Sequence, residues 1–149
     1  MSESVLFVDQ RNTCLSAVAE FAFRKATGFR VPVSSAGISP ADGYLEWRVR
    51  ELLRDEGFGF ELFLSFRSKK VSRQLLDAYD IVIAFNNSDL ARLRGKFPSH
   101  AHKIFLATEY AGEAGEIPDP CGEPAGSEGR CKESFERLLA LSNKIRGRL

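Results

Sequence analysis

The chain has 149 residues, of which 44% are hydrophobic and 28% charged, and its formal net charge is +1. This composition is typical of a soluble globular protein of one domain with a substantial core. The balanced charge argues against nucleic acid or anionic membrane as a partner, and no apolar run or leader approaches a membrane-targeting segment. Three cysteines without dense spacing favour reduced thiols and a cytoplasmic location. With two histidines and no CxxC pair, we expect no metal site and no cofactor.

Apolar runs alternate with amphipathic stripes along the chain. The runs predict four strands, at residues 5–8, 31–36, 81–85 and 103–108. The stripes predict a helix after each of the first three strands, a further short helix from about Ser72 and a last helix that carries Cys131 and Phe135. This alternation implies one α/β domain over residues 1–149, a three-layer sandwich with a four-stranded parallel sheet. Pro32 cannot donate to a strand ladder, which places the second strand at an edge.

The stretch "VLFVDQRNTCLSAVAE" at residues 5–20 combines a buried strand, a tight polar loop and the start of a helix. Such an arrangement usually binds phosphate through backbone N–H groups. It lies at the carboxyl end of the first strand, where ligands of parallel sheets bind, and Asn86 follows the third strand at the same edge. The first residue of the loop is nevertheless an anion, Asp9, and Leu15 before Ser16 carries no charge.

Four stretches resemble the low-molecular-weight protein tyrosine phosphatase family, in the family's order. They are the loop above, "SSAGISPA" at residues 34–41, "DAYDIVIAFNNSDLARL" at 77–93 and "IPDPCG" at 117–122. The family's loop reads Cys, five residues, Arg, then Ser or Thr: the Cys is the nucleophile, the Arg binds phosphate, and a remote Asp protonates the leaving group. The resemblance implies a nucleophile position at Asp9, a general acid at Asp119, a crevice wall at Tyr44, and a phosphate loop made of Gln10, Arg11, Asn12, Thr13, Cys14, Leu15 and Ser16.

Several positions depart from the family's pattern. Asp9 replaces the nucleophile, Leu15 the phosphate-binding Arg, Arg11 a glycine, Phe66 a histidine and Asn86 an aspartate. Loss of the nucleophile, the arginine and the supporting polar groups together predicts that the phosphatase reaction has been abandoned.

The Asp9 carboxylate has three interpretations. It accepts the N–H bonds of the loop in place of phosphate, it acts as a nucleophile with Mg²⁺ offsetting charge, or it helps to bind a less anionic ligand. Arg11 either reaches over the loop to replace the missing Arg or is a solvated surface side chain. We expect Cys14 to be an inert packed thiol.

The leading hypothesis is therefore a phosphatase-like protein with a degenerate loop, a catalytically impaired pseudophosphatase that acts as a binding or regulatory module towards an anion or a phosphoprotein. The alternative is an active phosphomonoesterase that uses Asp9 with Asp119 as general acid, so the sequence leaves enzymatic activity open. A third hypothesis, a structural or dimerising protein, requires an exposed apolar patch. The sequence predicts no oligomeric state.

Overall fold

The computed structural model of the chain describes residues 3–40, 43–117 and 128–149, the last segment with side chains from residue 132 onward. Four parallel strands form one sheet in the order β2-β1-β3-β4. Their bounds are β1 Val5–Asp9, β2 Val33–Gly37, β3 Ile81–Ala84 and β4 Ile104–Leu106. This confirms the predicted α/β fold, and β2 lies at an edge as predicted.

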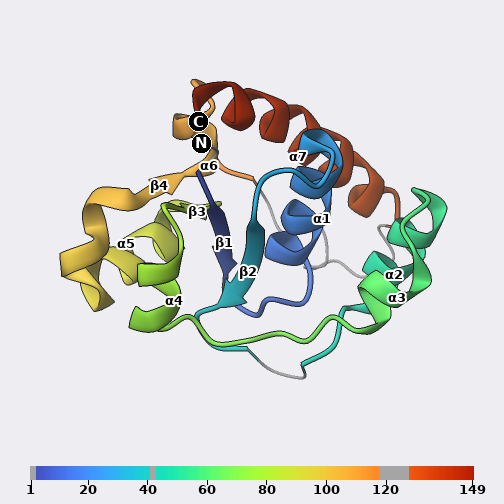
Figure 1. Cartoon of the computed structure of the whole chain (residues 1–149), viewed down its shortest axis with the longest axis horizontal. Helices are drawn as coiled ribbons and strands as arrows, with labels where there is room; N and C mark the ends of the chain where they lie inside the picture. Colours follow the sequence, from blue (N-terminus) through green and yellow to red (C-terminus); the bar gives the residue numbers. More distant parts are fainter. Residues whose placement is uncertain (1–2, 41–42, 118–127) are drawn as a thin grey trace.

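Helices cover both faces of the sheet (Figure 1). The helices are α1 Leu15–Thr27, α2 Trp47–Asp55, α3 Phe60–Leu64, α4 Arg73–Ala78, α5 Asn87–Lys96, α6 Ala107–Tyr110 and α7 Glu128–Arg148, with a 3-10 turn at Pro98–Lys103. Side chains of β1 alternate between two cores, because successive residues of a strand point to opposite faces. Val5 and Phe7 pack with α1, α2 and α7, whereas Leu6 and Val8 pack with α4 and α5. Among the described residues, no helix combines the length and apolar character needed to cross a membrane.

The structure corrects the predicted end of the fourth strand and adds one helix. The fourth strand ends at Leu106, and Ala107 and Thr108 begin the helix α6, whose turn closes with the hydrogen bond from Ala111 N to Ala107 O. The helix α3 was not predicted, because its five residues are too short to show a helical period.

The contact between α4 and the 3-10 turn predicts a pH dependence of stability. His100 Nε2 lies 2.6 Å from Asp77 Oδ1, and this hydrogen bond is the main reason why the pKa of Asp77 is lowered from its ordinary value of 3.8. A lowered carboxyl pKa stabilises the fold above the unfolded value, and that stability is lost as pH falls through the folded value. We therefore expect Asp77→Asn to lower the urea midpoint at neutral pH, and the difference from wild type to vanish below the folded pKa. An equal difference at all pH values would contradict this assignment.

Candidate phosphate-loop site

The loop between β1 and α1 is built around the Asp9 carboxylate, which is only 7% exposed. Asp9 Oδ1 accepts hydrogen bonds from Asn12 N at 2.7 Å and from Ser16 Oγ at 2.7 Å, and Oδ2 accepts from Ser16 N at 3.1 Å. The carboxylate thus binds the loop and the first turn of α1, where the backbone N–H groups have no partner within the helix. These contacts confirm the prediction that Asp9 accepts the N–H bonds of the loop.

Asn12 fixes the shape of this loop. It is fully buried and adopts φ = 58°, a left-handed conformation that asparagine tolerates better than most residues. Its Nδ2 donates to Ser16 Oγ at 2.9 Å, and its Oδ1 accepts from Lys69 N at 3.0 Å. Gly37 at the end of β2 closes the other side, since a Cβ there would lie 3.0 Å from the carbonyl carbon of Arg11. The loop is therefore fixed on one side by α1 and on the other by the segments that contain Gly37 and Lys69.

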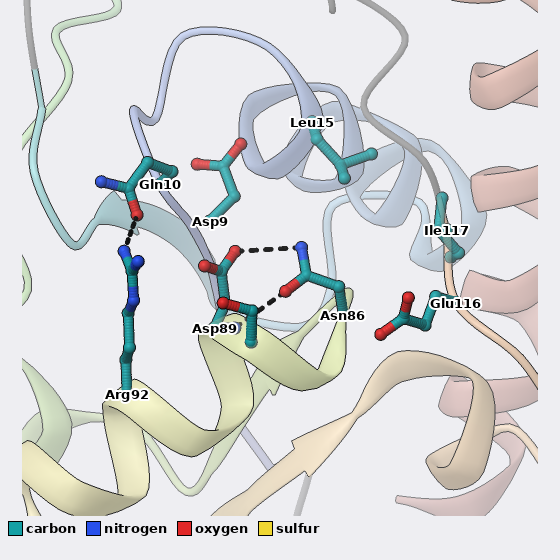
Figure 2. A pocket seen from close by; sticks show the side chains of 9 residues that line it. Asp9, Gln10, Leu15, Asn86, Asp89, Arg92, Glu116 and Ile117 are labelled. Carbon is teal, nitrogen blue, oxygen red and sulfur yellow. Dashed lines mark hydrogen bonds between the residues drawn. The ribbon is translucent and has the colours of Figure 1, made fainter.

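A pocket of about 820 Å³ opens beside the loop (Figure 2). Its lining comes from three parts of the chain, and consists of Asp9, Gln10, Leu15, Asn86, Ser88, Asp89, Arg92, Glu116 and Ile117. Arg92 Nη1 donates to Gln10 Oε1 at 3.0 Å, which joins α5 to the loop. The pocket therefore lies at the carboxyl ends of β1 and β3, the edge at which the sequence predicted a ligand crevice.

The N-terminus of α5 forms the far wall of this pocket. Asn86 caps the helix, its Oδ1 accepting from Asp89 N at 2.8 Å, and Asn87 N donates to Glu116 Oε2 at 2.6 Å. Among the described residues, the lining thus carries the three carboxylates of Asp9, Asp89 and Glu116 and the guanidinium of Arg92. Leu15 is 2% exposed and carries no charge. The described part of the lining therefore holds more negative than positive side chains.

The other predicted site residues lie apart from the pocket or outside the described residues. Arg11 is exposed, does not line the pocket, and its side chain has no hydrogen-bond or ion-pair partner among the described residues, as the solvated interpretation expects. Tyr44 is 59% exposed and stacks under Arg67, whose guanidinium carbon lies 4.4 Å from the ring centre, and it does not line the pocket either. Thr13 O accepts from Glu46 N at 3.0 Å. Asp119 lies outside the described residues.

Cys14 corrects one expectation. It is buried, 4% exposed, but it is disulfide-bonded and not the inert thiol that the sequence predicted. The partner sulfur lies outside the described side chains. Sequence spacing could not show the pairing, because a disulfide depends on two backbone segments approaching in space. In this state Cys14 offers no thiolate nucleophile to the loop.

Sequence reasoning missed five lining residues, Ser88, Asp89, Arg92, Glu116 and Ile117. The only available signal for the first three was their place on the helix after the third strand, whose N-terminus borders the crevice edge. Nothing local marked Glu116, which lies in a stretch rich in Gly and Glu. Among the described residues, no group of three or more His, Cys, Asp or Glu side chains is arranged to hold a metal ion.

Comparison with known proteins agrees with the fold. The family model described as low molecular weight phosphotyrosine protein phosphatase matches residues 4–146. The low molecular weight protein-tyrosine-phosphatase YfkJ of Bacillus subtilis is 32% identical over 133 residues, which are 78% of this chain and 80% of YfkJ. A protein-arginine-phosphatase of the same organism is 28% identical over 141 residues, 91% of each chain.

The solved structures give the same result. The crystal structure of a YwlE mutant from Bacillus subtilis superposes with a TM-score of 0.87 at 26% identity, covering 99% of this chain and 98% of YwlE. Sequence and fold therefore agree over nearly the whole length, and the chain belongs to the low molecular weight phosphotyrosine protein phosphatase family.

Proposed function

We propose that this chain is a catalytically impaired member of its family, a pseudophosphatase that acts as a binding or regulatory module. The observation that carries the proposal is the seating of the Asp9 carboxylate on Asn12 N, Ser16 N and Ser16 Oγ. A phosphate bound at the N-terminus of α1 would need the same donors. The protein thus fills its own phosphate loop with a negative charge.

Two free-energy terms oppose phosphate binding. Displacing the Asp9 carboxylate breaks hydrogen bonds to a charged acceptor, which contribute roughly 1.5–3 kcal/mol each. If the carboxylate stays, two unit charges about 4 Å apart repel by roughly 4 kcal/mol at an effective dielectric constant near 20. Leu15 offers no bidentate contact to offset either term. In either case the free energy of phosphate binding is unfavourable before the chemical step begins.

The charge of the pocket supports a ligand other than a phosphate monoester. Asp89 and Glu116 add negative charge to that of Asp9, and Arg92, the one guanidinium among the described lining residues, donates to Gln10. A ligand with less negative charge than a phosphoprotein side chain therefore fits this pocket better.

An aryl phosphate assay distinguishes the proposal from the alternative function, a phosphomonoesterase that uses Asp9 as nucleophile and Asp119 as general acid. We expect the full chain, with or without Mg²⁺, to hydrolyse an aryl phosphate at least about 10³-fold more slowly than YfkJ of Bacillus subtilis, because loss of one transition-state donor alone costs 10²–10³. Initial rates near neutral pH provide the measurement. Turnover within about tenfold of YfkJ that Asp9→Ala abolishes would overturn the proposal and establish the alternative.

A further inference from the structure

Lys69 is exposed, yet its amine is held against the edge strand β2. Its Nζ donates a hydrogen bond to Ser34 Oγ at 2.6 Å. Its backbone is fixed as well, because the N–H donates to Asn12 Oδ1 at 3.0 Å and the carbonyl accepts from Gly37 N at 2.8 Å. The amine is therefore accessible to small molecules in the solvent while the protein holds it in one place.

The charges of an ion pair on α1 act on this amine. Glu20 is 4% exposed, accepts from Ser35 Oγ at 2.7 Å and pairs with Arg24 at 2.7 Å. Burial of the amine is the main reason why the pKa of Lys69 is lowered from its ordinary value of 10.5. The Glu20 carboxylate opposes this lowering and the Arg24 guanidinium adds to it. The fold therefore favours the neutral amine of Lys69 more than water does.

A lysine in this environment is a nucleophile. The neutral amine has a free electron pair that attacks carbonyl carbon, whereas the ammonium ion has none. The next residue, Lys70, provides a comparison within the same chain. It is also exposed, and its side chain has no hydrogen-bond or ion-pair partner among the described residues. Because the two lysines are adjacent in the sequence, a difference in their reactivity reports on the fold around Lys69.

The charges around Lys69 indicate which class of reagent it takes. The stretch "RSKKVSR" at residues 67–73 carries four cations and no anion. Such a local positive potential raises the concentration of anionic reagents at the surface. The buried Glu20 carboxylate, in contrast, would repel a negatively charged product such as a carbamate. An acyl phosphate meets both conditions, because the reagent is an anion and the product is a neutral amide.

We propose that Lys69 is a modification site at which acyl phosphates acylate the amine held by Ser34. The neutral Nζ attacks the acyl carbon, an N–C bond forms and the C–O bond to the phosphate breaks. Inorganic phosphate leaves and takes up the proton that the nitrogen releases. The amide removes the positive charge of Lys69, while the backbone hydrogen bonds to Asn12 and Gly37 remain. This reaction is independent of whether the pocket has any catalytic activity.

Acetyl phosphate added to the full chain tests the proposal, with acetylation of each lysine followed by mass spectrometry. At about pH 8 we expect Lys69 to react at least about tenfold faster than Lys70, because each unit of pKa changes the neutral fraction tenfold. The rate at Lys69 should rise with pH and level off below 10.5, the ordinary lysine value. In urea that unfolds the chain, the rates at Lys69 and Lys70 should become equal.

Arg24→Gln tests the contribution of the neighbouring charges. Without this guanidinium the Glu20 carboxylate stabilises the ammonium form of Lys69, so acetylation at about pH 8 should slow about threefold or more. The limiting rate at high pH should stay unchanged. Arg54→Gln is the matched control, because it removes an exposed arginine that pairs with Asp55 on α2, and it should have no effect. The comparison of Lys69 with Lys70 in the unchanged chain does not depend on either variant folding.

Three results would contradict the proposal. Equal rates at Lys69 and Lys70 in the folded chain would show that the fold does not activate the amine. A preference for Lys69 that persists in urea would show that the local sequence, and not the fold, causes it. A preference seen with N-acetoxysuccinimide, a neutral acyl donor, but absent with acetyl phosphate would show that acyl phosphates are the wrong class of reagent.

Discussion

The double variant Asp9→Cys/Leu15→Arg is expected to hydrolyse an aryl phosphate at least about 10³-fold faster than the unchanged chain. The donors that now bind the Asp9 carboxylate, Asn12 N, Ser16 N and Ser16 Oγ, would then stabilise a thiolate at the same position. Leu15 is the first residue of α1, and it lines the pocket. An arginine at this position would therefore reach the pocket and bind two phosphate oxygens.

The single variants should gain far less, because nucleophile and phosphate-binding group act as a unit. Asp9→Ala/Leu15→Arg is the matched control: it removes the carboxylate and adds the cation without supplying a nucleophile, so it should bind phosphate without turning it over. Steady-state rates and isothermal titration with inorganic phosphate separate these outcomes. A folded double variant that binds phosphate but gains no turnover would show that Asp9 and Leu15 are not the residues that limit phosphatase activity.

Asp9→Asn is expected to lower stability and to create a weak anion site at the same time. The substitution keeps the shape of the side chain, but an amide cannot accept from all three present donors, and it removes a negative charge from the N-terminus of α1. The expected loss of unfolding free energy is about 3 kcal/mol. For a chain of this length that corresponds to a melting temperature lower by about 6–12 °C.

Sulfate should recover part of this loss in Asp9→Asn, because the freed donors can bind an anion that the carboxylate no longer repels. Sulfate at ten times its dissociation constant would return about 1.4 kcal/mol. Thermal melts in sulfate and in sodium chloride of equal ionic strength measure the effect. Asp89→Asn, which removes another buried carboxylate from the same pocket, is the matched control and should show no such recovery. An Asp9→Asn variant as stable as wild type and indifferent to sulfate would show that the carboxylate does not support the loop.

The disulfide of Cys14 differs from the hydrogen bonds of the loop in how far apart along the chain its partners lie. It joins a loop residue to a sulfur outside the described side chains, so its effect on the loop depends on a distant segment. The hydrogen bonds of Asp9, in contrast, span at most seven positions of the chain. Local contacts of this kind can be inferred from a strand, a loop and a helix start, which explains why the seating of Asp9 was predictable and the disulfide was not.

The sequence by itself determined the alternation of strands and helices, the edge position of β2 and the place of Asp9 and Leu15 in the loop between the first strand and the first helix. Each of these depends on composition, period or neighbours close along the chain. Only the tertiary structure decided which residues meet at the pocket: Gln10 and Arg92 are 82 positions apart, and Glu116 is 29 positions from Asn87, whose backbone N–H it accepts. The same holds for α2, because the spacing of Trp47 and Arg54 along one helix face is visible in the sequence but the exposure of that face is not. Packing of the whole chain decides which helix face meets the core and which meets solvent.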